Sequence, residues 1–250
     1  MNNFNENQKK ILNELKALRL HGMIDALQNQ FNNEHVYSAV SFDQRLEDLI
    51  TRQIAYKDEN TYRRLLHQGK LKFMTSFNDL HFSAVDGISE ENLHYLISNN
   101  WLFVKPVNII IQGPCGVGKS SLACCLLNGC AREGASIRFY KMNDLAIDIL
   151  IATNSPSDTK SLMNSLVRYK VLCLDDFGCE KLDPKVISFL YNLIDARWES
   201  KPIIITSQLK IEAYAGLLGG NVQAEAIVDR LLRPAKIITM EGDSKRTTLS

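Results

Sequence analysis

Apolar side chains recur at steps of three and four residues through the first hundred residues, which is the spacing of one face of an α-helix. The earliest run comprises Leu12, Leu15, Leu18, Met23, Ile24, Leu27 and Phe31. Gly22 interrupts this run and predicts a break between two short helices. We therefore expect a small helical region at the amino terminus.

A longer helix is predicted to begin after Ser41. Ser41 and Gln44 form a Ser-x-x-Gln capping box, in which each side chain bonds the backbone amide of the other residue. The apolar face of this helix is expected to consist of Phe42, Leu46, Leu49, Ile50 and Ile54. Basic residues stud the later part of this region, namely Arg52, Lys57, Arg63, Arg64, Lys70 and Lys72. Such a run suits either a solvated helix face or a surface that contacts phosphates or a partner.

From about Val104 the pattern changes to short β-rich runs that alternate with helical segments. The expected strands are residues 108–112, 136–140, 171–175, 202–206 and 235–240. Strand and helix in alternation favour a parallel sheet covered by helices. Asp183 followed by Pro184 predicts a helix start, whereas the polar stretch 154–160 is expected to be a surface loop.

A phosphate-binding loop is predicted between the first strand and the helix after it. Residues 113–120 read GPCGVGKS and match GxxxxGK[ST]. Glycine lets the backbone amides converge on phosphates, and the helix N-terminus adds positive potential. Lys119 is expected to contact the β- and γ-phosphates of ATP, and the Ser120 hydroxyl to ligate Mg²⁺. The predicted lining is Gly113, Pro114, Cys115, Gly116, Val117, Gly118, Lys119, Ser120 and Ser121.

Polar residues also end two other predicted strands. Asp175 and Asp176 follow an apolar run; we expect Asp175 to hold Mg²⁺ and Asp176 to act as general base towards the attacking water. Thr206, Ser207 and Gln208 end the next strand along the chain. They suit either hydrogen bonds to the γ-phosphate or the water, or a plain exit from strand to loop.

Composition narrows the class of protein further. The 250 residues carry 29 Lys and Arg against 28 Asp and Glu, a net charge of +1, so any nucleic-acid binding must come from a local patch. The 45% hydrophobic content is ordinary for a globular protein. None of the six cysteines forms a CxxC pair, and no apolar run is long enough to span a membrane. We expect reduced thiols and a cytoplasmic location.

The order of these motifs resembles the IstB family of insertion-sequence transposition helper ATPases, which are similar to DnaC-type helicase loaders. The segments that carry the resemblance are 15-LKALRLHGMIDAL-27, GPCGVGKSSLA, 174-LDDFGCEKLD-183, 206-TSQL-209, 226-AIVDRLL-232 and 242-GDSKR-246. The phosphate loop is generic to many ATPases, whereas the first and the TSQL segments are more specific.

The resemblance implies an α/β fold of the AAA+ P-loop ATPase type, with a five-stranded parallel sheet, behind a small helical domain. It places the helical domain at residues 1–68, a linker and helix at 69–103, and an ATPase domain without a helical lid at 104–250. It implies ATP-dependent self-assembly on double-stranded DNA and a transposase partner. By position, Gln208 with Ser207 corresponds to sensor I, Arg230 to the arginine finger, and Arg246 to a carboxy-terminal sensor arginine.

Asp176 departs from the pattern, because many AAA+ relatives carry Glu there, and the shorter side chain bears on the strength of hydrolysis. Three alternatives stay open. The nearest is a DnaC-like replicative helicase loader; the others are a P-loop kinase for a small metabolite and a scaffold that binds ATP without turnover. ATP turnover with and without duplex DNA separates an ATPase of this family from the last two.

Overall fold

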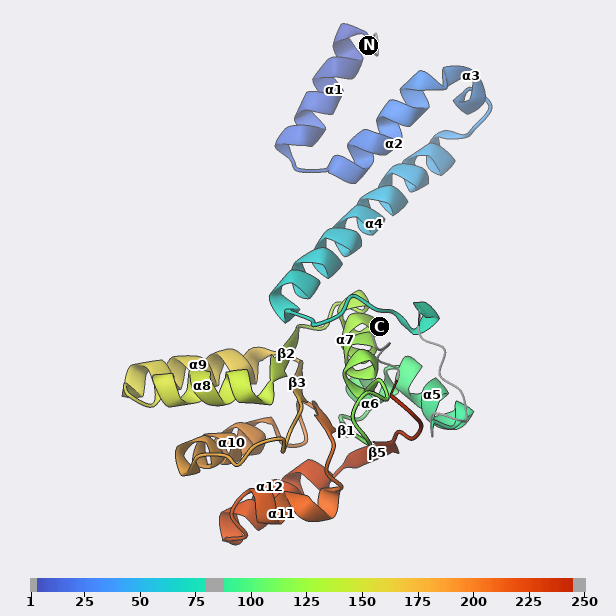
Figure 1. The fold of residues 1–250 in the computed structure, drawn as a ribbon. Helices are drawn as coiled ribbons and strands as arrows, with labels where there is room; N and C mark the ends of the chain where they lie inside the picture. The colour runs from blue at the N-terminus through green and yellow to red at the C-terminus, as the bar shows by residue number, and fades with distance from the viewer. Residues whose placement is uncertain (1–3, 80–87, 245–250) are drawn as a thin grey trace, which may run out of the picture. The chain divides into compact units, whose positions relative to one another are not determined.

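The computed structural model describes residues 4–79 and 88–244, which belong to two compact units, Met1–Arg64 and Leu65–Ser250 (Figure 1). The helix α4 begins in the first unit and ends in the second. Within the described ranges, no helix is long and apolar enough to cross a bilayer.

The first unit is helical, as its apolar periodicity predicts. Its elements are α1 (Glu6–Ala17), α2 (His21–Asn32), α3 (Glu34–Tyr37) and the beginning of α4 (Phe42–Gly69). The predicted capping box at α4 is confirmed: the Gln44 amide donates to Ser41 Oγ, and the Ser41 amide donates to Gln44 Oε1, both at 3.3 Å.

The predicted helix break at Gly22 is wrong. Gly22 lies inside α2, and the chain turns between the two helices at residues 18–20 instead. A Cβ at Gly22 would lie 2.5 Å from the backbone oxygen of Arg52 and 2.7 Å from the Cα of Gln53. The glycine is therefore explained by the close approach of α2 to α4 rather than by a turn.

The apolar face expected for α4 is only partly buried. Leu49 is half-buried, whereas the side of α4 that contacts α2 uses the buried Gln53, whose Oε1 accepts the Met23 amide at 3.3 Å. The other apolar positions remain exposed, at 68% for Phe42, 38% for Leu46, 44% for Ile50 and 56% for Ile54. The periodicity therefore identified an apolar helix face, but most of that face is exposed rather than buried against α2.

The second unit contains the predicted five-stranded parallel sheet, with strand order β2-β3-β4-β1-β5. The strands are β1 (Asn108–Gln112), β2 (Ile137–Lys141), β3 (Val171–Asp175), β4 (Ile203–Ser207) and β5 (Ala235–Thr239). The predicted α/β fold with a five-stranded parallel sheet is thus confirmed, together with every expected strand to within one residue. Ile109, Ile110 and Ile111 are fully buried because β1 lies inside the sheet.

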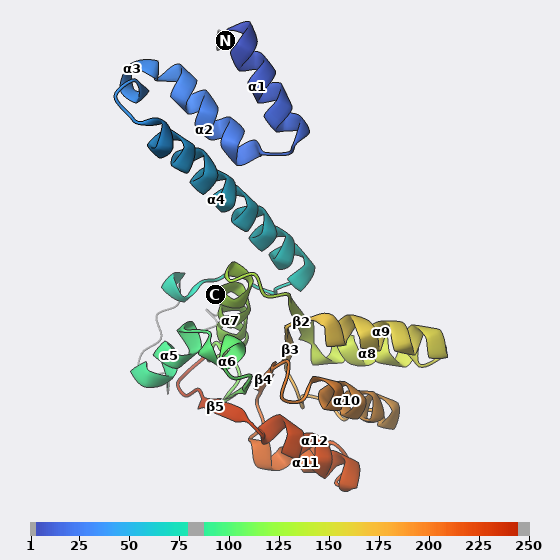
Figure 2. The same cartoon turned by 180° about the vertical axis from the view of Figure 1, so that it is seen from behind.

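Helices cover both faces of the sheet (Figures 1 and 2). On one side lies α7 (Lys119–Arg132), with α5 (Glu90–Ile97) and α6 (Asn100–Phe103) beside it. On the other lie α8 (Met142–Ala152), α9 (Pro156–Arg168), α10 (Pro184–Arg197), α11 (Tyr214–Leu217) and α12 (Val222–Leu232). Alternate strand residues Leu172, Leu174, Ile203 and Ile205 pack into the core under this second layer.

Two expectations about helix starts have opposite outcomes. The Asp183-Pro184 start is confirmed, because Asp183 Oδ1 accepts the Lys185 amide at 2.7 Å and Pro184 opens α10. The surface loop expected at 154–160 is wrong, since α9 begins at Pro156. A proline in the first helical turn removes no intrahelical hydrogen bond, so Pro156 can begin a helix within this polar stretch.

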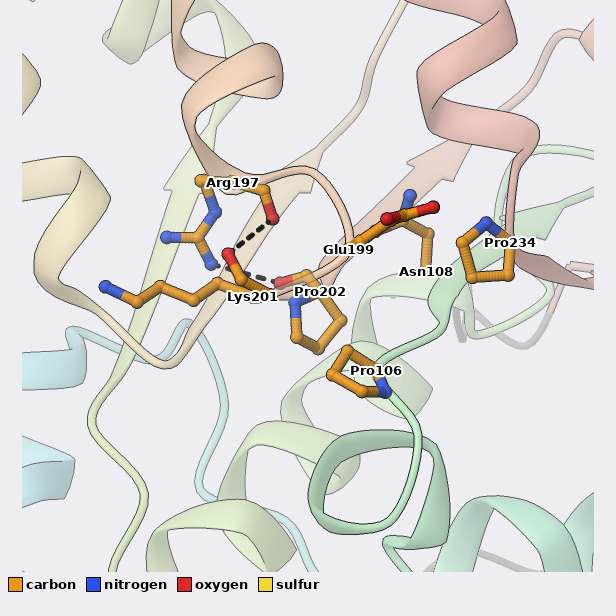
Figure 3. Close-up of a pocket in the computed structure, with 8 residues that line it drawn as sticks. Pro106, Asn108, Arg197, Glu199, Lys201, Pro202 and Pro234 are labelled. Carbon is orange, nitrogen blue, oxygen red and sulfur yellow. Dashed lines mark hydrogen bonds between the residues drawn. The ribbon is translucent and has the colours of Figure 1, made fainter.

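The buried Arg197, in the last turn of α10, connects the start of β4 to the end of α9, and Figure 3 shows it beside Pro202. The guanidinium of Arg197 donates to the carbonyls of Leu166 and Tyr169 at 2.9 Å each, Pro202 at 3.1 Å and Lys170 at 3.4 Å. Burial lowers the pKa of Arg197 to about 9, so it remains charged at neutral pH. The adjacent pocket has a volume of about 10 Å³, which suits nothing larger than one water.

Replacing Arg197 with leucine should destabilise the second unit by roughly 3 kcal/mol, because buried carbonyls lose their donors. Urea unfolding followed by circular dichroism measures the change. Arg168→Leu, at an exposed position at the end of α9, is the matched control and should shift stability by less than about 0.5 kcal/mol. Equal effects of the two substitutions would contradict the role assigned to Arg197.

Candidate nucleotide site

The phosphate loop connects the end of β1 to the start of α7, where the sequence places it. Gly118 is the N-cap of α7 with a φ of 102°, a left-handed conformation that favours glycine. Gly113 has a φ of 151°, and a Cβ there would lie 2.2 Å from the carbonyl oxygen of Met240. The loop therefore needs glycine both for its backbone path and for its contact with the segment after β5.

Lys119 lies buried within the loop. Its Nζ donates to the carbonyls of Gly113 at 2.7 Å and Pro114 at 2.5 Å, and burial lowers the pKa of its ammonium. Val117 is buried, whereas Pro114 and Cys115 are exposed, and Gly116 and Ser121 are intermediate. Two carbonyls of the phosphate loop thus hold the ammonium group that is expected to contact the phosphates of ATP.

The Asp175 carboxylate brings three elements together at the carboxyl edge of the sheet. Its Oδ1 accepts hydrogen bonds from Ser120 Oγ on α7 and from Thr206 Oγ1 on β4, both at 2.6 Å. Its Oδ2 is buried and accepts no hydrogen bond from the described residues. Lys72 forms an ion pair with this carboxylate, with its Nζ 3.7 Å from Oδ2.

These residues fit a bound Mg²⁺. A hydroxyl and a carboxylate are the oxygen donors that this ion prefers, and they adjoin the loop built for phosphates. Asp175 Oδ2, which accepts no hydrogen bond from the described residues, would supply a ligand for the ion or an acceptor for one of its waters. Ser120 and Asp175, predicted separately from distant segments, are in direct contact.

Asp176 sits next to this site in a left-handed backbone conformation, with a φ of 58°. Its amide donates to Thr206 Oγ1 at 3.0 Å, which fixes the turn, while its side chain stays partly exposed. Asp and Asn are the side chains, besides glycine, most often found in this conformation. The backbone therefore favours the aspartate that departs from the glutamate of many AAA+ relatives.

The polar residues that end β4 have different surroundings. The Thr206 hydroxyl donates to Asp175 Oδ1 and accepts the amide of Asp176. The Ser207 hydroxyl donates to the Phe177 carbonyl at 2.6 Å and accepts the Leu209 amide at 3.0 Å, so it holds two loops together. Gln208 is exposed, with Nε2 3.7 Å from the Cys179 sulfur. Of the three, Gln208 has the side chain free to contact a bound phosphate or water.

Comparison with known proteins identifies the family. The sequence profile described as IstB-like ATP binding protein matches residues 13–250. The chain belongs to this family. It is 34% identical to an ATP-binding protein of insertion sequence IS1162 from Pseudomonas fluorescens, over 79% of this chain and 85% of that one. It is 28% identical to the corresponding protein of IS5376 from Geobacillus stearothermophilus, over 83% and 82%.

Solved structures share the fold of this IstB-like chain. The DnaC helicase loader has a TM-score of 0.53 at 22% identity, covering 71% of this chain and 99% of that one. AMPPCP-bound DnaA from Aquifex aeolicus has a TM-score of 0.56 at 17% identity, covering 70% and 52%. Both likenesses concern the fold alone, which agrees with the AAA+ topology.

Arg230 has a partner that reasoning within its own helix missed. Its Nε lies 2.8 Å from Asp195 Oδ1 on α10, and its guanidinium stacks 5.1 Å from the ring of Tyr191. This partner lies 35 residues earlier in the chain, on a different helix. Arg233, three residues further on, forms an ion pair with Asp229 of its own helix at 2.9 Å. Arg246 lies outside the described residues.

Lys72 lies near the site, although the sequence alone assigned this lysine no role there. It appeared only as one of several basic residues after the long helix. Its segment contacts α7 further on, where the Asn128 side-chain amide donates to the Thr75 carbonyl at 2.8 Å. No local sequence motif predicts that Lys72 contacts Asp175, because the contact depends on how the segment after α4 packs on α7.

Removing the Lys72 charge should favour cation binding, since the ammonium neutralises the carboxylate that Mg²⁺ would share. Lys72→Met is expected to raise the affinity for Mg²⁺ in the presence of ATP about threefold to tenfold. Magnesium titration of a bound fluorescent ATP analogue measures it. Lys70→Met is the control, because Lys70 lines the same cleft beside β2. A loss of affinity in Lys72→Met would instead indicate that Lys72 binds phosphate.

Proposed function

We propose that this IstB-like protein binds and hydrolyses ATP, assembles on duplex DNA, and recruits or stimulates its cognate transposase at target DNA. The observation that carries the proposal is the contact of Ser120 with Asp175 beside the phosphate loop of Lys119. Relatives described as insertion-sequence ATP-binding proteins support the link to transposition. The likeness to DnaC keeps helicase loading as the second candidate.

In the proposed mechanism, Lys119 leaves the loop carbonyls and contacts the β- and γ-phosphates, where it stabilises the charge that develops. Ser120 and Asp175 would hold Mg²⁺, which would supply positive charge to the same phosphates. Asp176 accepts the proton of the attacking water, and Gln208 orients that water. Ser207 keeps the loop of Gln208 in position through its bonds to Phe177 and Leu209.

We assign ATP hydrolysis to residues 104–250, and contacts with DNA, partner or other subunits to the helical region 1–68, with 69–103 as the connection. One local basic surface supports an additional contact with DNA. Lys70, Lys72, Arg138 and Lys141 line a cleft of about 500 Å³ beside β2, although Asp144 and Asp148 line it too. Local cations of this kind bind the DNA backbone in a salt-dependent manner.

ATP turnover measured with and without duplex DNA is the central test. We expect DNA to stimulate the wild type, Lys119→Ala to lose ATP binding, and Asp176→Asn to bind ATP with turnover reduced about a hundredfold or more. Asn tolerates the left-handed backbone of Asp176, so this variant removes the proton acceptor without straining the turn. Turnover that ignores DNA would favour a metabolite kinase, and equal turnover by Asp176→Asn would exclude it as the base.

The position of Arg230 supports a role between subunits. The carbonyl of Leu231 accepts a 2.9 Å bond from Asn108, the first residue of β1, whereas the phosphate loop follows the last residue of β1. Arg230 on α12 and Lys119 on α7 thus lie near opposite ends of β1. In the proposal, Arg230 leaves Asp195 on assembly and stabilises the γ-phosphate bound by a neighbouring subunit.

Mixing two inactive variants tests this finger. Arg230→Ala should bind ATP but turn over slowly, and Lys119→Ala should be inactive while carrying an intact Arg230. Mixed on DNA, they should regain a measurable fraction of wild-type phosphate release, because Arg230 of one variant can complete the site of the other. Asp195→Asn, which frees Arg230 from its ion pair, is the control for a purely structural role. Co-assembled mixtures as inactive as their components would contradict the trans arrangement.

A further inference from the structure

An exposed apolar ridge runs along α4 in the first unit. It consists of Phe42, Leu46, Ile50 and Ile54, all at least 38% exposed, and is called the α4 ridge below. Steps of four residues form one of the two natural ridges of a helix surface, which pack into the grooves of another helix. Within the described residues of its own unit, nothing buries this ridge.

The neighbouring helix α2 occupies a different side of α4. Gly22 approaches Arg52 and Gln53, and the Gln30 side chain donates to the Arg45 carbonyl at 3.1 Å. Figures 1 and 2 both show α2 along one side of α4. The α4 ridge is therefore not the remainder of the α2 contact but a separate apolar surface.

Opposite charges lie at equal distances from Ile50 of the α4 ridge. Asp43 lies seven residues before Ile50, and Lys57 lies seven residues after it. Seven residues are close to two helical turns, so both charges lie on the same side of α4 as Ile50. In the portion of the chain that the structure describes, neither side chain forms an ion pair.

We propose that the α4 ridge is an isologous interface, in which a second copy of this chain packs its own α4 antiparallel across a twofold axis at Ile50. In this register Ile50 faces Ile50, Leu46 faces Ile54, and Asp43 of each copy faces Lys57 of the other. A twofold contact requires a surface that complements itself, and the opposite charges at equal distances from Ile50 meet that requirement.

The charges beside the α4 ridge favour a second copy over nucleic acid. Glu47 and Asp58 lie near it as well as Asp43 and Lys57, so the surface lacks the excess of positive charge that a phosphate backbone needs. Burial of Leu46, Ile50 and Ile54 from each copy supplies the driving force. This pairing requires no nucleotide, so it is separate from the ATP-dependent assembly proposed above.

Sedimentation velocity of the full-length protein over a concentration series, without ATP or DNA, tests the pairing. The wild type should dimerise, and Ile50→Asp should raise the dissociation constant at least tenfold, because it places two carboxylates together at the axis. Ile151→Asp on α8, where the isoleucine is 64% exposed, is the matched control and should leave dimerisation unchanged. A monomeric wild type, or equal loss in both variants, would overturn the proposal.

Charge reversal then tests the register. Asp43→Lys and Lys57→Asp should each weaken the dimer about threefold to tenfold, because each opposes like charges at both ends of the contact. The double variant restores opposite charges and should return to within about twofold of the wild type. Lysine in the first turn of α4 disfavours the helix in both the single and the double variant, so helix damage cannot produce the recovery. Additive weakening would overturn the antiparallel arrangement.

Discussion

The buried carboxylate of Asp175 is the constraint on which the nucleotide site depends. A charge removed from water must be matched by hydrogen bonds or by an opposite charge. Asp175 meets this need with the hydroxyls of Ser120 and Thr206 and with the nearby ammonium of Lys72. The phosphate loop, two strands and the segment after α4 are therefore held to one another by the group that is proposed to serve the metal.

Satisfying that charge also determines which side chains around it are free. Thr206 bonds both Asp175 and the amide of Asp176, and Ser207 bonds the loop that follows. Consecutive residues of β4 therefore serve the framework, and only the exposed Gln208 remains for the reacting groups. The sequence resemblance treated Ser207 and Gln208 as one feature, whereas their surroundings separate them.

The elements and motifs that depend on local signals could be predicted from the sequence. Buried strands with short apolar runs, the glycine-rich loop and the caps at Ser41 and Asp183 are of this kind. The failures concern contacts between distant segments. Gly22 matched a helix break because the approach of Arg52 is invisible in the sequence. The sequence likewise does not show that Arg230 pairs with Asp195, 35 residues away on another helix. Lys72 needed the packing of its segment on α7 to reach Asp175.

The order of the strands also bears on aggregation. β2 and β5 are the edges of the sheet, and an unpaired strand edge can template pairing with another chain. Arg138 and Lys141 lie on β2 and Lys236 on β5, so both edges carry cations of the kind that discourage such pairing. Arg138 and Lys141 thus discourage pairing at the β2 edge and also line the cleft beside β2. Neutralising several of them at once would promote association between chains, and a loss of DNA binding in such variants would then have two causes.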